Sequence, residues 1–357
     1  MKSPSLLLSG ISEEAILRWM VLVLSVLIGG VAGLLSVIIA QVLMNFSNKY
    51  GRGDSTKFGG LVIVSFFYLA IIMFEGVSGA LVSSFEVKVF LIYAFLVFVL
   101  GVVNEVFVNF TVSKLMLTYC VLSIVFLQFV PELSGALTAQ NFINFEQSLV
   151  YTYLCIAFLL VSAIFSFYVS NGSSSLVPSL SVLIIIGISS YDLGVLGVFL
   201  SLAAVGSVIF LLFNVSIGQI YIGAGGSCFL GFLLGLAFIV LLEKPEVDVG
   251  YLLCIYFYPL VVFLGFVGRV CARWVRLDCG FVYFHDLVFS EFLRMPVTKK
   301  NAGAITGVLV STVFAGIPVL IKNTDVNVNW LYFYLLMWVA LIFLSAFILF
   351  RRRFFKF

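Results

Sequence analysis

Two pairs of neighbouring polar residues stand out in a largely apolar chain. Asn104 and Glu105 follow one apolar run, and His285 and Asp286 lie within DCGFVYFHDLVFSEFLRM, where His285 is the only histidine. Oxygen ligands suit a hard cation, and histidine can bind or protonate a phosphate. Each pair also has a simpler interpretation. Glu105 would be a solvated loop acid, and the segment around His285 would be an amphipathic helix on the membrane, with Asp286 at its start and its apolar residues toward lipid.

Two further groups have residue types that suit anions. Arg269, Arg273 and Arg276 are spaced by three to four residues and share one helix face. Arginine pairs well with lipid phosphate, although simple anchoring by positive charge is the favoured interpretation. The stretch Gly223–Ser227 opens an apolar run, so its main-chain amides would form an anion site at a helix N-terminus. The alternative is close packing of small residues between helices.

The composition sets the elements that must position these residues. Of the 357 residues, 63% are hydrophobic and only 10% are charged, and the mean hydropathy is +1.25. Water-facing surface needs more charge than this, so a soluble enzyme, a disordered chain and a disulfide-rich secreted domain are excluded. The apolar runs are continuous rather than alternating, which favours helices over a transmembrane β-barrel. The net charge of +3 does not indicate any particular partner. We expect the protein to contact the lipid bilayer and not to bind nucleic acid.

Apolar runs of about 20 residues predict an all-α, polytopic membrane protein with about eleven transmembrane helices in one domain, residues 1–357. The expected spans are 16–44, 59–82, 87–103, 114–130, 149–169, 175–190, 193–213, 226–242, 249–268, 302–321 and 330–350. If the N-terminus lies outside and the C-terminus in the cytoplasm, 14 of the 19 lysines and arginines face the cytoplasm. The polar residues then gather in cytoplasmic loops 45–58, 104–113, 170–174, 214–225 and 269–301, which predicts a site for a charged substrate there.

Five short motifs occur in order at the inner ends of these spans. They are STKFGG (Ser55–Gly60), GVVNE ending in Asn104 and Glu105, YVSNGSSSLV with Asn171 and Gly172, Asn214 ten residues before Ala224 in IGAGGSCFLGF, and arginines followed by His285. Their order and spacing resemble the polyprenyl-phosphate N-acetylaminosugar-1-phosphate transferases (glycosyltransferase family 4). These bacterial integral membrane enzymes begin O-antigen, teichoic-acid and related glycan synthesis and include the phospho-MurNAc-pentapeptide translocase.

The resemblance implies a chemistry and a set of site residues. A UDP-N-acetylhexosamine would give its sugar 1-phosphate to undecaprenyl phosphate at the cytoplasmic face of the bacterial inner membrane, with Mg²⁺ or Mn²⁺ if the chain is active and no metal otherwise. The implied catalytic residues are Asn104, Glu105, His285 and Asp286. The implied substrate-binding residues are Lys57, Gly59, Gly60, Lys114, Asn171, Gly172, Asn214, Gly223, Gly226, Ser227 and Arg273.

The sequence departs from the family where charge is needed. The expected aspartate pair is Asn104-Glu105, the third-loop aspartates are Asn171 and Ser174, and the expected metal aspartate is Ala224. The metal ligands are therefore unknown. Three interpretations stay open: a divergent transferase with impaired or altered activity, a silent relative that binds polyprenyl phosphate or a partner enzyme, and a small transporter or flippase. A transporter would show paired charges or broken helices at mid-membrane, and none is evident beyond Glu75. Homodimerisation also stays open.

Overall fold

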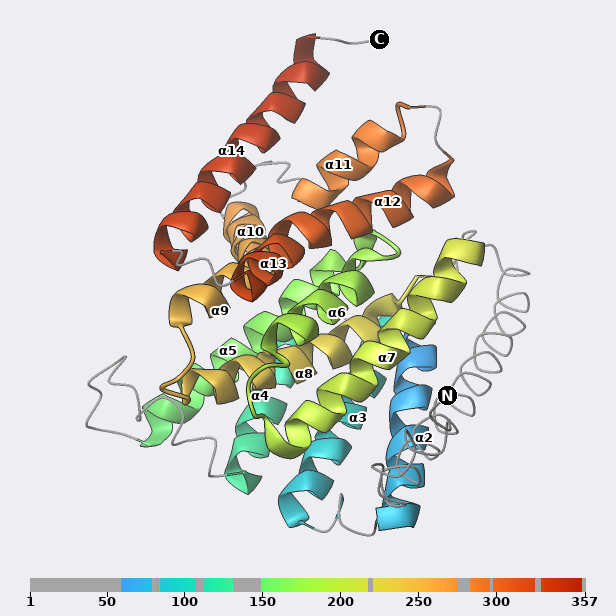
Figure 1. The fold of residues 1–357 in the computed structure, drawn as a ribbon, viewed down its shortest axis with the longest axis vertical. Helices are drawn as coiled ribbons and strands as arrows, with labels where there is room; N and C mark the ends of the chain where they lie inside the picture. Colours follow the sequence, from blue (N-terminus) through green and yellow to red (C-terminus); the bar gives the residue numbers. More distant parts are fainter. Residues whose placement is uncertain are drawn as a thin grey trace, which may run out of the picture.

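The computed structural model describes residues 59–78, 82, 84–106, 112–130, 149–217, 221–274, 283–295, 298–324 and 329–354. Within these ranges the chain is helical and contains no strand (Figure 1). The expected span 16–44 and Lys57 lie outside them. The elements are α2 (Gly60–Ser78), α3 (Phe85–Val106), α4 (Val112–Phe129), α5 (Leu149–Val169), η3 (Ser170–Gly172), α6 (Leu176–Ile188), α7 (Gly194–Ile217), α8 (Gly223–Leu242), α9 (Val249–Ile255), α10 (Phe257–Trp274), α11 (Phe284–Phe292), α12 (Lys299–Ser311), η4 (Thr312–Gly316), α13 (Ile317–Asn323) and α14 (Trp330–Phe354).

The helices fit a multi-pass membrane protein. In the described part of the chain, six helices are long and apolar enough to cross a bilayer, and α9 with α10 makes a seventh if that bent pair is one span. The shorter apolar helices 60–75, 113–129 and 176–188 match other expected spans. The helical membrane class is therefore supported, whereas the count of eleven and the orientation stay predictions.

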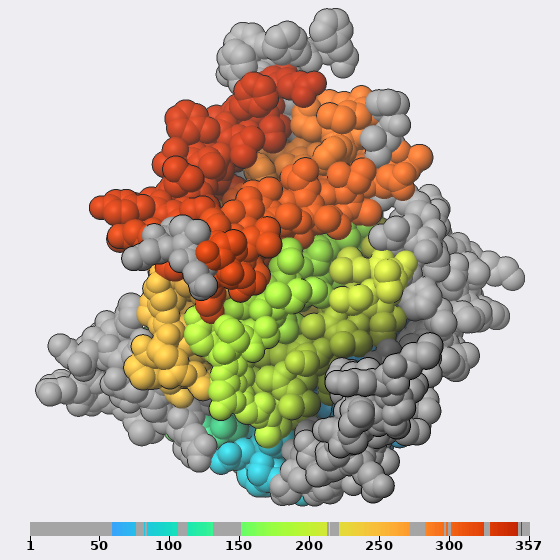
Figure 2. All heavy atoms as spheres, in the orientation of Figure 1, coloured from blue at the N-terminus to red at the C-terminus, as the bar shows by residue number. Residues whose placement is uncertain are grey.

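Helix α8 forms the centre of the bundle (Figure 1), where it packs mainly against α3 and α5. Of its spanning window, 83% is buried, against 17% for α14. Figure 2 shows the C-terminal helices, in orange and red, gathered at one end of the molecule. A central helix must touch its neighbours on every side, so its surface needs small residues where backbones approach closely.

Glycines supply that close approach. A Cβ built on Gly60 would lie 2.5 Å from the Cα of Gly226, and one built on Gly101 would lie 2.6 Å from the Cα of Gly225. The neighbouring atoms are main-chain atoms, so they cannot move aside as a flexible side chain would. The packing interpretation of the glycine stretch is therefore correct for Gly225 and Gly226. Anion binding at the same helix end stays a prediction.

Two of the expected spans are irregular: one is bent between two helices, and the other contains a π-helical turn within a continuous helix. Helices α9 and α10 meet at an angle of 66°, and η4 is a π-helical segment between α12 and α13. Pro259 and Pro318 lie in the first turns of α10 and α13, where each lacks the N–H that would bond to the carbonyl four residues earlier. The expectation that no broken helix is present, apart from the hint at Glu75, is therefore wrong. Glu75 itself accepts a hydrogen bond from the main-chain N–H of Val82 at 2.8 Å.

The glycine contact predicts a large effect of a single methyl group. We expect Gly60→Ala and Gly226→Ala each to destabilise the fold by about 1–3 kcal/mol, because the added Cβ overlaps a main chain. The measurement is the free energy of unfolding in mixed detergent micelles. Gly268→Ala in α10 is the matched control, since its Cβ would meet nothing within 4 Å. Equal stability of all three variants would refute the close contact.

Candidate functional site

The pair Asn104 and Glu105 lies on the last turn of α3 rather than in a loop. The apolar run continues through Val102 and Val103 with no glycine or proline to end the helix, so α3 extends to Val106. The side-chain amide of Asn104 donates to the hydroxyl of Tyr168 at the end of α5, at 3.0 Å. Glu105 Oε2 accepts the main-chain N–H of Ala224 at 2.9 Å.

Glu105 therefore caps the N-terminus of α8. That end of the helix carries unpaired N–H groups and a partial positive charge, which a carboxylate stabilises. Gly223 begins the helix with a φ of 77°, a conformation that residues with a side chain rarely adopt. Ser227 Oγ donates to the carbonyl of Gly223 at 2.8 Å. Ala224, at the expected metal position, contributes its main-chain N–H and not a ligand.

The start of α2 is fixed beside the same helix end. The N–H groups of Gly59 and Gly60 donate to the carbonyls of Tyr221 and Ile222, at 2.9 and 2.6 Å. This short main-chain pairing, together with the contact between Gly60 and Gly226, sets α2 against α8. The implied residues Gly59, Gly60, Asn104, Glu105, Gly223, Gly226 and Ser227 thus form one group of neighbours, which we call the α8 cluster.

A second group surrounds the only histidine. His285 and Asp286 occupy the first turn of α11, and a Cβ built on Gly172 would lie 3.5 Å from His285 Nε2 and 3.4 Å from Asp286 Oδ1. The Oδ1 atom of Asn171 is buried and has no hydrogen-bond partner among the described residues. We call Asn171, Gly172, His285 and Asp286 the η3–α11 cluster. The expectation that the apolar side of this helix faces lipid is wrong for Leu287 and Val288, which are buried against protein.

The environment of His285 favours its neutral form. The side chain is 1% exposed, and its ring lies parallel to that of Tyr283 with centroids 5.5 Å apart. The guanidinium of Arg269 lies 4.1 Å from the centre of the Tyr283 ring. Burial lowers the pKa of His285 below its usual value; the Asp286 carboxylate opposes this shift, and Arg269 adds to it.

The end of α5 connects the two clusters. Tyr168, which bonds Asn104, is followed three residues later by Asn171 in η3, and η3 contacts both α8 and α11. Other implied residues lie apart from them. Asn214 is on α7 and not in a loop, and its side-chain amide is buried without a hydrogen-bond partner in the described part of the chain. Lys114 is exposed on the first turn of α4, and Arg273 lies near the end of α10.

Among the described residues, the carboxylates of Glu105 and Asp286 do not come together in a metal site. Within the described ranges, no three His, Cys, Asp or Glu side chains lie close enough together to hold a metal ion. Glu105 is directed at the N–H of Ala224, and Asp286 belongs to the other cluster. The Mg²⁺ or Mn²⁺ that the resemblance implies therefore stays a prediction, and no chemical step is assigned to a metal here.

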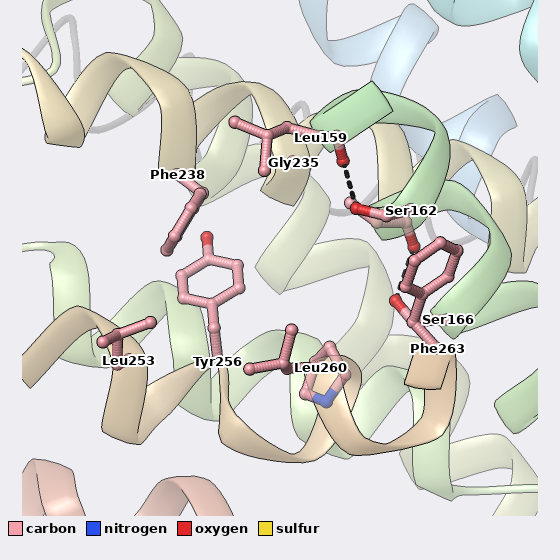
Figure 3. A pocket seen from close by; sticks show the side chains of 11 residues that line it. Leu159, Ser162, Ser166, Gly235, Phe238, Leu253, Tyr256, Leu260 and Phe263 are labelled. Atoms are coloured by element: carbon pink, nitrogen blue, oxygen red, sulfur yellow. Dashed lines mark hydrogen bonds between the residues drawn. The ribbon is translucent and has the colours of Figure 1, made fainter. Parts of the chain in front are cut away.

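An apolar cavity lies between the helices, lined by none of the cluster residues. It has a volume of about 190 Å³ and lies between α5, α8, α9 and α10 (Figure 3). Its polar side chains are Ser162, Ser166 and Tyr256, and their hydroxyls donate to the carbonyls of Leu159, Ala163 and Leu234 at 2.7–2.8 Å. Because each of these hydroxyl hydrogens is already donated, the cavity suits a hydrocarbon chain. Ser166, which lines the cavity, is two residues before Tyr168 on α5.

Sequence reasoning missed the tyrosines that hold the site together. Tyr168, Tyr258 and Tyr283 lie within or beside apolar runs and have no fixed spacing to Asn104 or His285. Pro259, by contrast, was a readable signal for the bend between α9 and α10, because proline inside a span removes a helical hydrogen bond.

Comparison with known proteins adds no family to this geometry. A scan against protein-family models finds no match, and no curated protein matches the chain. The relationship to the transferases therefore rests on the motifs quoted above and stays a prediction.

The cap by Glu105 predicts that two substitutions lower the stability of the fold by different amounts. Glu105→Ala leaves the Ala224 N–H without this acceptor and should cost about 1–3 kcal/mol of unfolding free energy. Glu105→Gln keeps an acceptor and should cost about 0.3–1 kcal/mol through the lost charge at the helix end. Unfolding in mixed micelles measures both. Glu246→Ala, at an exposed acid 4.0 Å from Lys244, is the control and should change stability by under about 0.5 kcal/mol.

Burial of His285 predicts a dependence of stability on pH. A histidine whose folded pKa is lowered binds fewer protons when folded than when unfolded. Its stabilising contribution is therefore complete above the unfolded value of about 6.5 and is lost as the pH falls through the lowered pKa. We expect the melting temperature of the natural protein to fall more steeply between about pH 7 and pH 5 than that of His285→Gln. Parallel curves would show that His285 does not titrate in this way.

Proposed function

We propose that the chain is a divergent membrane transferase that moves a sugar 1-phosphate from a UDP-N-acetylhexosamine to undecaprenyl phosphate during cell-surface glycan synthesis. The proposed location is the bacterial inner membrane, with the site on its cytoplasmic face. The observation that carries the proposal is the assembly, near one end of α5, of motif residues that are distant in the sequence. The resemblance supplies the identity of the substrates.

The cavity supports a long-chain lipid as the acceptor. A polyprenyl chain has no hydrogen-bonding groups, and the hydroxyl hydrogens in the cavity are donated to main-chain carbonyls. Ser166 of the cavity and Tyr168 beside the clusters lie on the same helix, α5, and we propose that the phosphate end of the lipid extends from the cavity toward the clusters. Arginine is a suitable partner for that phosphate.

A second candidate function is binding of the polyprenyl phosphate without transfer. The specific observation in its favour is the hydrogen bond between Glu105 and Ala224 N–H, because a carboxylate engaged as a helix cap is not directed at a metal or a reacting group. The lack of a metal-binding group among the described residues is consistent with it. The bend between α9 and α10 keeps a small transporter or flippase open as a third candidate, since transporters use broken spans.

Release of UMP separates the first two candidates. Purified protein would receive undecaprenyl phosphate, a panel of UDP-sugars, and Mg²⁺ or Mn²⁺. We expect UMP from the natural protein and a loss of at least roughly tenfold in Glu105→Gln, because the change removes the only acid at a motif position of the α8 cluster. No UMP with any donor, together with saturable binding of the lipid, would support the silent relative.

The cavity has its own test. We expect Leu260→Trp, at a position that lines the cavity, to weaken saturable binding of undecaprenyl phosphate in nanodiscs by roughly tenfold, because the indole fills space needed by the chain. Leu264→Trp on the same helix is the matched control, since Leu264 is 48% exposed and does not line the cavity. Equal affinity of both variants would place the lipid chain elsewhere.

A further inference from the structure

A buried hydrogen bond connects the only histidine to α10. The hydroxyl of Tyr258 lies 2.7 Å from Nδ1 of His285, and both side chains are almost fully buried. Tyr258 and His285 are 27 residues apart in the sequence and lie on helices joined by a long segment, so this bond is a product of the tertiary fold.

The number of hydrogens available at this bond determines which atom is the donor. A phenolic hydroxyl has one hydrogen to donate and can accept two. The Tyr258 hydroxyl is fully buried, so its hydrogen needs an acceptor within the protein. In the described part of the chain, Nδ1 is the acceptor within hydrogen-bonding distance of this hydroxyl. Leaving a buried hydroxyl hydrogen unpaired would disfavour the opposite tautomer by roughly tenfold or more. Tyr258 therefore donates to Nδ1, and the proton of the neutral ring is on Nε2.

The protonated Nε2 is buried and lies beside the partly exposed Asp286 and the exposed Gly172 of the η3–α11 cluster. It is 3.6 Å from Asp286 Oδ1, too far for a hydrogen bond but close enough for the carboxylate to attract the N–H dipole. Gly172 leaves the space beside Nε2 free of a side chain, since a Cβ there would lie 3.5 Å away. Asp286 has 43% of its side chain exposed, so this edge of the cluster reaches solvent.

We propose that Tyr258 is a positioning residue that holds His285 as the neutral, Nε2-protonated tautomer, so that His285 offers the site a hydrogen-bond donor. In this form Nε2 has no free lone pair. His285 is then neither the general base nor a metal ligand at this edge, and it acts by donating to an oxygen of the bound molecule. The identity of that molecule rests on the proposed function, whereas the tautomer does not.

A single histidine makes the tautomer directly measurable. Protein labelled with ¹⁵N only in histidine gives one imidazole spin system, in which the protonated and unprotonated nitrogens resonate far apart. At pH 7.5 we expect Nε2 protonated and Nδ1 unprotonated in the natural protein. In Tyr258→Phe the preference should fall from roughly tenfold or more to near equal populations, because the donor to Nδ1 is gone.

Tyr251→Phe is the matched control. It also removes one buried tyrosine hydroxyl, which donates to the Gly187 carbonyl at 2.9 Å, and it should leave the histidine signals unchanged. A natural protein with Nδ1 protonated, or an unchanged tautomer ratio in Tyr258→Phe, overturns the proposal. The spectrum of the natural protein decides the tautomer even if Tyr258→Phe does not fold.

The same spectrum separates this inference from the proposed function. Addition of undecaprenyl phosphate with UDP-N-acetylglucosamine should shift the Nε2 signal, and Gly172→Leu, which covers Nε2, should abolish that shift while the tautomer persists. The expected tautomer with no binding of either compound would refute the proposed function alone. Bound substrates with Nδ1 protonated would refute the tautomer alone.

Discussion

The close approach of α8 to its neighbours through glycine is the constraint on which the rest of the structure depends. Gly226 brings the main chain of α8 against Gly60 of α2, and Gly225 brings it against Gly101 of α3. Because α3 lies so near, Glu105 at its last turn reaches the first N–H groups of α8. The candidate site is thus built on backbone contacts in the centre of the bundle, where a side chain would push the helices apart.

The same arrangement explains why the carboxylates do not act together. Glu105 is directed at a helix N-terminus, where its charge offsets the partial charge of α8. Asp286 lies with His285 on the short helix α11 and belongs to the η3–α11 cluster, whereas Glu105 belongs to the α8 cluster. Two acids in separate environments can serve separate roles, one in holding the fold and one at the open edge beside Gly172. This division fits a chain in which glycines persist at motif positions while most expected aspartates are replaced.

Several features could be predicted because they depend on local composition. Continuous apolar runs predicted helices, and each expected span from residue 59 onward overlaps one or more helices. The motif order predicted that residues near 60, 104, 171 and 224 would meet on one face of the membrane; the structure places them in two clusters at the end of α5, and their role in a site stays a prediction. The ends of the helices were harder to predict from the sequence. Helices α3 and α7 continue through Asn104 and Asn214, because no glycine or proline there ends them.

By itself, the sequence determined the solvent of this protein, its helical class and the residues available for chemistry, because hydropathy and residue type are properties of the chain alone. Only the tertiary structure decided what those residues contact. The bond from Tyr258 to His285, the cap of α8 by Glu105 and the cavity beside Ser166 each join atoms from different helices. Such contacts are set by the rotation and distance of packed helices, which side-chain volumes across the bundle determine collectively and no local pattern encodes.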